Sequence, residues 1–220
     1  MTQITKAVNE PILSFAAGSP ERASLQAKYD EMATQTIEIP LIIGGQEIKT
    51  GDTGNCVMPH NHQHVLATYH KAGETEVIQA IDAAMKSWKT WSTTTLEERT
   101  KIFRKAAELL QGPWRDTINA ATMLNQSKNA FQAEVDAACE LIDFFNFNAQ
   151  YAEEITSKQP LISPEGMHNH LEYRPLEGFV FAITPFNFTS IAGNLPSAPV
   201  LMGNVALWKP ASSAVLPCYY

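Results

Sequence analysis

Two apolar stretches near the end of the chain constrain its fold more than any other feature. The segment Leu176–Thr189 predicts a buried strand that runs into a loop presenting the amide of Asn187. The segment Asn204–Pro210 predicts a second strand, which ends on a single cation, Lys209. Strands that are apolar with little interruption are typical of parallel sheets covered on both faces. Since the upstream segments favour helices, the sequence predicts an α/β fold whose parallel sheet begins in these residues.

Apolar spacing and capping patterns predict helices upstream of the two strands. They cover Gly73–Lys89, a segment from Thr95 to Gly112, a segment from Pro113 to about Gln126, and Asn129–Glu154. The last of these helices is apolar on two faces, which predicts burial from both sides.

Shorter elements are expected elsewhere. Residues 40–49 predict a hairpin around a pair of glycines, residues 50–64 are turn-rich, and Val65–His70 favours a strand. Proline and glycine in residues 1–36 predict an arm without a long helix. Residues 156–174 are polar and broken by prolines, and they predict a hairpin-like segment that projects from the body and could make subunit contacts.

Composition argues against several classes of protein. The 220 residues carry a net charge of −7 and a pI of about 5.4, which disfavours a surface for nucleic acid or anionic membranes. The chain has no apolar run long enough to span a bilayer, and its first residues lack the apolar core of a signal peptide. The cysteines Cys56, Cys139 and Cys218 are too few and too scattered for a disulfide framework. These features predict a cytoplasmic location, with no nucleic-acid or membrane partner.

Asn187 and Lys209 are the strongest candidates for chemistry, because ligands of open α/β sheets bind beyond the carboxyl ends of strands. The amide of Asn187 could donate to a developing oxyanion, or it could cap the following helix. Lys209 could bind a ribose hydroxyl or a phosphate of a nucleotide, or it could be an ordinary surface lysine. The occurrence of Asn187 at the end of a neighbouring strand strengthens the functional interpretation of Lys209, whereas the residues alone leave the capping role of Asn187 open.

Glu140 lies in the helix that is apolar on two faces, so its carboxylate must be paired or hydrogen-bonded. It could bind a substrate ammonium group or form a structural ion pair. Alternating histidines could ligate a metal, but no cysteine or carboxylate cluster completes such a site, so none is predicted; these residues are His60, His62, His64, His168 and His170. No cysteine has the setting of a nucleophile, and Cys139 within a packed helix is expected to be inert.

The motifs around the two strands resemble those of NAD-dependent aldehyde dehydrogenases. Ile183–Phe188 is similar to that superfamily's proline-aromatic-asparagine signature, and Leu207–Pro210 to its lysine-proline signature. Within the superfamily, the chain resembles the branch that oxidises L-glutamate γ-semialdehyde (1-pyrroline-5-carboxylate) to L-glutamate in proline breakdown. Further stretches of the chain carry that resemblance, which extends from about residue 36: Gln132–Ala138, Glu140–Phe145, Phe147–Ala149, Leu176–Phe179, Gly193–Leu195 and Pro199–Asn204.

The resemblance implies roles on the substrate side. Asn187 would donate to the oxyanion of a thiohemiacetal intermediate and is the implied catalytic residue. Phe188 would pack on the aliphatic part of the substrate, and Glu140 matches a carboxylate on the substrate side.

The resemblance implies a cofactor side as well. Lys209 would bind the adenine ribose of NAD, with Ile183, Thr184 and Pro185 along the cofactor. Ser212 stands where the family often has an acidic residue that contacts the ribose.

The resemblance also divides the chain into regions. The expected regions are an N-terminal arm (1–36), the helical part of the NAD-binding domain (37–155), a hairpin-like oligomerisation segment (156–174) and the start of the Rossmann-like sheet (175–220). The fold would then be the N-terminal part of the aldehyde dehydrogenase fold, in an enzyme that forms homo-oligomers. The nucleophilic cysteine and the catalytic domain of the family are not among these residues, so we expect the chain alone to be inactive. Two alternatives remain: a non-catalytic assembly or nucleotide-binding module, and an aldehyde dehydrogenase with another substrate.

Overall fold

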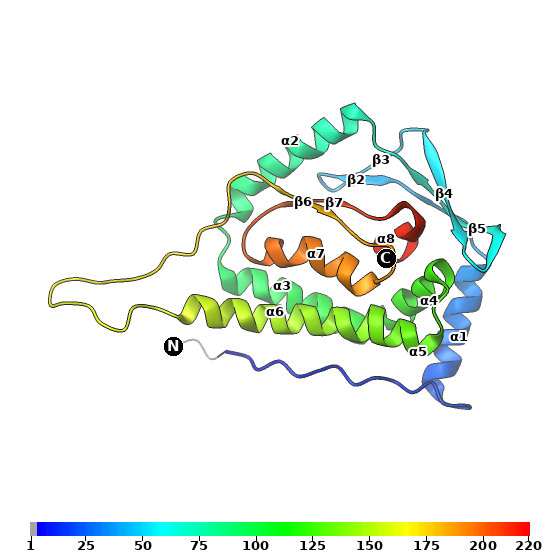
Figure 1. Ribbon diagram of the computed structural model, residues 1–220, viewed down its shortest axis with the longest axis horizontal. Helices are drawn as coiled ribbons and strands as arrows, with labels where there is room; N and C mark the ends of the chain where they lie inside the picture. Colours follow the sequence, from blue (N-terminus) through cyan, green and yellow to red (C-terminus); the bar gives the residue numbers. More distant parts are fainter. Residues whose placement is uncertain (1–3) are drawn as a thin grey trace.

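The computed structural model describes residues 4–220 (Figure 1). Its helices are α1 (Pro20–Ala33), α2 (Glu74–Trp91), α3 (Leu96–Gln111), α4 (Arg115–Gln126), α5 (Ala130–Ala133), the π-helix η1 (Glu134–Cys139), α6 (Glu140–Ser157), α7 (Thr189–Leu201), the 3-10 helix η2 (Ser212–Ala214) and α8 (Val215–Tyr219). Its strands are β1 (Ile37–Ile39), β2 (Leu41–Ile43), β3 (Gln46–Ile48), β4 (Thr53–Met58), β5 (Asn61–His70), β6 (Val180–Ile183) and β7 (Ala206–Lys209). None of these helices is both long and apolar enough to cross a membrane.

The strands β6 and β7 form a parallel pair, as the sequence predicts, with Ile183 opposite Lys209 at the carboxyl end. Helix α7 connects them and packs on them, and it also packs against α6. Helix α2 contacts β7, and in Figure 1 it lies on the opposite side of the strand pair from α7. Helix α7 covers one face of the pair, but the other face is only partly covered: Phe181 and Ile183 of β6 are 58% and 61% exposed, so the burial predicted for this strand is incomplete within residues 4–220.

The predicted helices over residues 73–126 are confirmed with small shifts at their ends. Helix α3 begins with the expected capping box: Thr95 Oγ1 accepts from the Glu98 amide at 3.2 Å, and the Glu98 carboxylate accepts from the Thr95 amide at 3.0 Å. The last predicted helix is present but is divided, because its first part contains the π-helix η1. Its middle is buried on two sides, whereas Phe131 and Tyr151 near its ends are exposed.

Two expectations for the first 70 residues are wrong. Residues 20–33 form a 14-residue helix, because Pro20 occupies the first turn, where its missing N–H is not needed, and Ser19 caps the helix. The turn-rich residues 50–64 contain β4 and the start of β5, which pair antiparallel. Register shifts on either side of Val57 accommodate the irregular sequence within that pair. The predicted hairpin of residues 40–49 is confirmed as β2 and β3.

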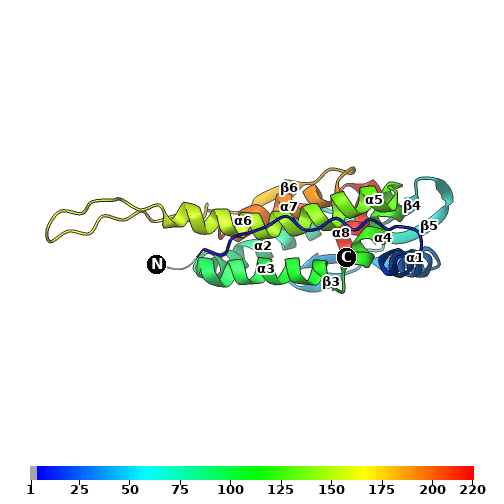
Figure 2. The same cartoon turned by 90° about the horizontal axis from the view of Figure 1, so that it is seen from below.

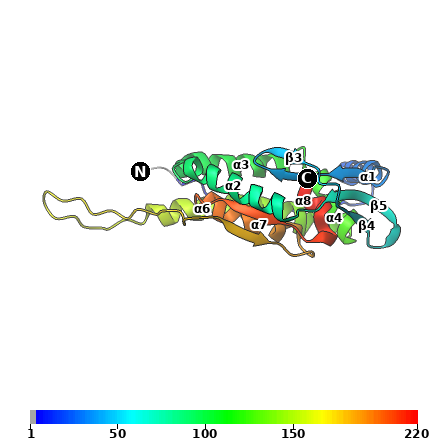
Figure 3. The same cartoon turned by 90° about the horizontal axis from the view of Figure 1, so that it is seen from above.

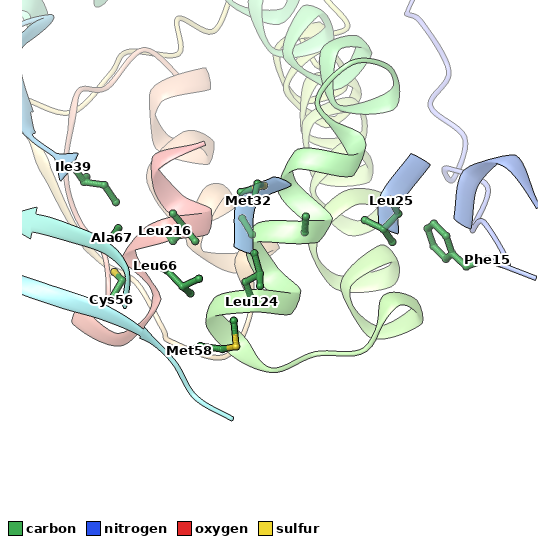
Figure 4. Packing of buried hydrophobic residues seen from close by; sticks show 12 residues of the cluster. Phe15, Leu25, Met32, Ile39, Cys56, Met58, Leu66, Ala67, Leu124 and Leu216 are labelled. Carbon is green, nitrogen blue, oxygen red and sulfur yellow. The ribbon is translucent and has the colours of Figure 1, made fainter. Parts of the chain in front are cut away.

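A cluster of buried side chains joins α1, β4, β5, α4 and α8 (Figure 4). Leu66 and Leu124 lie at its centre and are almost fully buried. It forms the core of this end of the molecule and fixes the place of the loop between α4 and α5.

Residues 158–179 leave the body at the end of α6, extend well beyond it and return to β6 (Figures 1 and 3). The predicted projection is present, but this segment contains no strands. Side chains hold its two limbs together instead: the amide of Leu171 donates to Gln159 Oε1 at 2.8 Å, and Asn169 hydrogen-bonds to Ser163 and Ile162.

A buried ion pair ties the N-terminal arm to the helices. Arg115 of α4 contacts Glu134 of η1, and it also binds Glu10 at 2.5 Å and the carbonyl of Pro11 at 2.9 Å. Glu134 in turn accepts from the amide of Leu13 at 2.9 Å. The arm consequently runs along the helical segment α5–α6 (Figure 2).

The carboxylate of Glu134 is fully buried and is satisfied by its partners. Burial alone raises its pKa, but hydrogen bonds from Arg115, the Leu13 amide and Asn119 outweigh burial, and the net pKa lies below the usual 4.5. The folded state therefore favours the charged carboxylate. This contribution to stability is complete above pH 4.5 and is lost as the pH falls through the lowered pKa.

We predict that Glu134→Gln lowers the free energy of unfolding by about 3 kcal/mol at neutral pH, because the substitution removes the principal partner of a buried guanidinium. Urea unfolding at a series of pH values measures the effect. The difference from wild type should shrink as the pH falls below 4.5, where wild type loses the same charge. Glu97→Gln, in an exposed pair with Lys101, is the control and should change little. A difference that is constant with pH would contradict this account of Glu134.

Candidate functional site

The carboxyl ends of β6 and β7 bring several predicted residues together. The amide of Thr184 donates to the carbonyl of Lys209 at 3.2 Å, which extends the strand pairing by one residue. The side chain of Thr184 is buried, and its Oγ1 accepts from Trp208 Nε1 at 3.0 Å. These bonds hold the turn at Thr184 and Pro185 beside the end of β7.

The cofactor-side residues predicted from the sequence lie along this edge. Lys209, the last residue of β7, and Ser212 after it are exposed, and Ile183 at the end of β6 is 61% exposed. An apolar surface beside an ammonium and a hydroxyl can cover a nucleotide's ring and sugar while donating to its hydroxyls. The side chains present therefore fit a nucleotide.

Asn187 lies in the loop between β6 and α7, and its side chain is exposed. The N-cap residue of α7 is Phe188, and no side-chain capping bond is made there. The alternative in which Asn187 caps this helix is therefore wrong. The main-chain carbonyl of Asn187 accepts from Lys128 Nζ at 2.5 Å, and this contact does not use the side-chain amide.

Glu140, the first residue of α6, lies opposite the first turn of α7. Its Oε2 is 2.6 Å from Ser190 Oγ, and the same hydroxyl is 3.1 Å from Asp136 Oδ1. One hydroxyl proton can serve only one of these carboxylates at a time. The structural ion pair that the sequence left open for Glu140 does not form within residues 4–220, where the recorded partner of its carboxylate is Ser190.

Lys128, Asp136 and Ser190 were not found by sequence reasoning, although all three lie at the site. Asp136 precedes Glu140 by four residues in an apolar helix, and this spacing could have identified it as a second carboxylate on the same face. Lys128 comes from the loop between α4 and α5, and no local pattern marks a lysine there. Its position depends on how α4 packs.

The cysteines are poor nucleophiles in this structure. Burial, with the neighbouring charge of Glu134, raises the pKa of Cys139 to about 12, and burial raises the pKa of Cys218 to about 12 as well. Burial also raises the pKa of Cys56.

No metal site is formed by the described part of the chain, residues 4–220, where no group of three histidine, cysteine or carboxylate side chains could hold an ion. His60 Nδ1 instead lies 2.7 Å from Ser127 Oγ. His168 and His170 stack on each other in the projecting segment.

Comparison with known proteins identifies the family. A match to the aldehyde dehydrogenase family spans residues 47–220. The chain belongs to that family. The resemblance drawn from the motifs is confirmed, and the mixed α/β fold is that of the N-terminal part of an aldehyde dehydrogenase.

Several relatives of this aldehyde dehydrogenase chain are named Delta-1-pyrroline-5-carboxylate dehydrogenase. The Delta-1-pyrroline-5-carboxylate dehydrogenase of Agaricus bisporus is 50% identical over 212 residues, which are 96% of this chain and 39% of the relative. The human protein, named as mitochondrial, is 47% identical over 218 residues, which are 99% of this chain and 38% of its own length. The crystal structure of the Mycobacterium tuberculosis enzyme bound with NAD has a TM-score of 0.96 at 47% identity and covers 100% of this chain and 41% of its own. The chain thus spans about two fifths of the length of these relatives.

We predict that Cys139 in the native aldehyde dehydrogenase chain reacts with iodoacetamide at least about 100-fold more slowly than in the urea-unfolded chain, because burial keeps its thiol protonated. Mass spectrometry of timed samples at mildly alkaline pH measures the modified fraction at each cysteine. The unfolded chain, in which every thiol is accessible, is the control. Equal rates in the two states would show that the thiol is exposed and ionisable.

Proposed function

We propose that the chain forms the nucleotide-binding, N-terminal part of an enzyme that oxidises L-glutamate γ-semialdehyde to L-glutamate with NAD. The observation that carries the proposal is the carboxyl-terminal edge of β6 and β7, where Thr184 pairs with Lys209 and is followed by Pro185 and by the loop that carries Asn187. Support comes from relatives named Delta-1-pyrroline-5-carboxylate dehydrogenase, one of them solved with NAD.

On the cofactor side, Lys209 donates to the adenine ribose, and Ser212 supplies a neutral hydroxyl beside it. Ile183, Thr184 and Pro185 line the path of the cofactor. NAD, when bound, accepts a hydride from the substrate. The residues of this chain hold its adenosine half: Lys209 is presented by the end of β7, and the partly buried bond between Thr184 and Trp208 keeps the turn after β6 in place.

On the substrate side, the exposed amide of Asn187 donates to the oxygen of the aldehyde as negative charge develops there. Phe188, which is 39% exposed, offers one face of its ring to the aliphatic part of the substrate. Glu140 is half-buried beside Ser190 and accepts from the substrate's ammonium group. We assign no covalent step to residues 4–220, because burial raises the pKa of each of their cysteines.

We further propose that the chain acts in the cytoplasm, as its composition favours, although several relatives carry names that place them in mitochondria. Fractionation of cells that express the protein at its native level tests this location. Recovery with the mitochondrial fraction would overturn it.

We predict that NAD binds the protein and that Lys209→Ala weakens binding by about 10-fold or more, since a charged hydrogen bond contributes about 1.5–3 kcal/mol. Isothermal titration calorimetry measures the dissociation constants. Lys105→Ala, in an exposed pair with Glu108 on α3, is the matched control and should leave binding unchanged. The second measurement is the rate at which the longer enzyme implied by this proposal oxidises L-glutamate γ-semialdehyde.

The outcomes separate the candidate functions. Binding with semialdehyde turnover supports the proposal. Binding without turnover favours a nucleotide-binding module, and turnover of other aldehydes in preference favours an aldehyde dehydrogenase with another substrate. Equal binding by wild type and Lys209→Ala would overturn the assigned cofactor site.

We also propose that the projecting segment of residues 158–179 mediates self-association. Leu161 is 99% exposed and Ile162 is 79% exposed, so both apolar side chains lack cover within residues 4–220. We predict that replacing both by serine lowers the molar mass measured by light scattering, because it removes apolar contact area between copies. Glu165→Gln in the same segment is the control. An unchanged mass after the double substitution would contradict this role.

A further inference from the structure

Lys128 connects the helical part of the molecule with the loop that carries Asn187. It lies between α4 and α5, directly after Ser127, whose backbone is left-handed with a φ of 53°. Its side chain is 17% exposed, so its ammonium needs partners. All the partners that the structure records for it lie at the candidate site.

The ammonium of Lys128 contacts both loop residues that have proposed roles with the substrate. It donates to the main-chain carbonyl of Asn187 at 2.5 Å. It also lies over the ring of Phe188, 4.4 Å from the ring centroid, within the range of a cation–π contact. One cation therefore restrains two neighbouring residues, one through its backbone and the other through one face of its side chain.

Asp136 of η1 holds this ammonium in place. Its Oδ2 pairs with Lys128, and its side chain is only 5% exposed. The same carboxylate lies 3.1 Å from Ser190 Oγ and 3.4 Å from the amide of Thr189, both in the first turn of α7. Asp136 thus connects the lysine to the helix that follows the loop.

We propose that Lys128, anchored by Asp136, is a positioning residue that holds the loop of Asn187 and Phe188 for the reaction. This inference rests on the proposed function. A cation bound to a main-chain carbonyl leaves the side-chain amide of Asn187 able to donate to the substrate, while it limits rotation of the peptide that carries that amide. The contact with Phe188 fixes the buried face of its ring and leaves the other face exposed. Lys128 touches no substrate in this arrangement and acts through these two residues.

Lys128→Met removes the ammonium and keeps most of the apolar stem. We expect kcat for the semialdehyde to fall by about 10-fold to 100-fold, because displacement of a catalytic group by about 1 Å can cost about 100-fold. The KM for NAD should stay within about two-fold, since Lys209 and Thr184 are untouched. If Lys128 had only a structural role, Lys128→Met would lower the melting temperature of the enzyme and weaken NAD binding together. Lys105→Met is the matched control, because that lysine also pairs with a carboxylate but lies on the exposed face of α3.

Hydrogen–deuterium exchange provides a second readout that does not depend on turnover. In the longer enzyme that the proposed function implies, Lys128→Met should raise exchange in residues 186–190 and leave β7 unchanged. Lys128→Arg, which keeps the charge, serves if the Met variant does not fold. Raised exchange in residues 186–190 together with a lowered kcat supports the inference. Exchange at the wild-type level, or a wild-type kcat, overturns it.

Failure of the inference and failure of the proposed function are distinguishable. If the wild-type enzyme does not turn over the semialdehyde, the proposed function fails, and the role given to Lys128 falls with it. If wild type turns over the semialdehyde and Lys128→Met does so with the same kcat, only the positioning role is overturned.

Discussion

The buried contact between Arg115 and Glu134 is the interaction on which the remaining arrangement depends. It joins α4 to the π-helix η1 and binds the N-terminal arm through Glu10 and Leu13. A guanidinium and a carboxylate buried this deeply are tolerated only when each has its partners, so the helices cannot slide past one another without leaving a charge unpaired. The geometry of η1 also helps to form this buried contact. Its bonds join residues five apart, as between the Glu140 amide and the Val135 carbonyl, and its Glu134 and Cys139 both face Arg115.

The segment that begins with η1 makes contacts on two of its sides. On one side, Glu134 contacts Arg115 and the arm. On the other side, Asp136 and Glu140 contact the first turn of α7. Since π-turns are frequent at functional sites, this division has a physical rationale: the segment is anchored on one side so that its carboxylates are placed on the other. The loop of Asn187 is then held by Lys128, and Asp136 pairs with this lysine and also contacts the first turn of α7, which follows the loop. These residues are far apart in the sequence, so the site exists only when the helical part and the strand pair are packed together.

The strand pair and the residues at its carboxyl end could be predicted from the sequence, because apolar runs and their terminal polar residues are local signals. The sequence does not predict α1, because prolines in residues 1–36 indicate breaks in a helix, whereas Pro20 stands at a helix start, where proline is favoured. The π-turn within the last predicted helix was missed because its apolar spacing resembles that of an α-helix. Lys128 could not be found at all, because its role depends on contacts across 59 residues of sequence. Local patterns therefore identified the residues proposed to meet ligands, but not those that hold them.

This difference follows from how the proposed functional side chains are supported. Asn187 is held through its main-chain carbonyl, and Lys209 through the pairing of β7 with β6. Phe188 is restrained on one face by the ammonium of Lys128. In each case the supporting contact is made by the backbone or, for Phe188, by the ring face toward Lys128. The side-chain atoms proposed to contact substrate or cofactor remain exposed. An N–H group that donates to a ligand is not available for a hydrogen bond within the fold. The supporting contacts must therefore come from other segments, and in this chain they come from buried charges upstream of the strands that present the site.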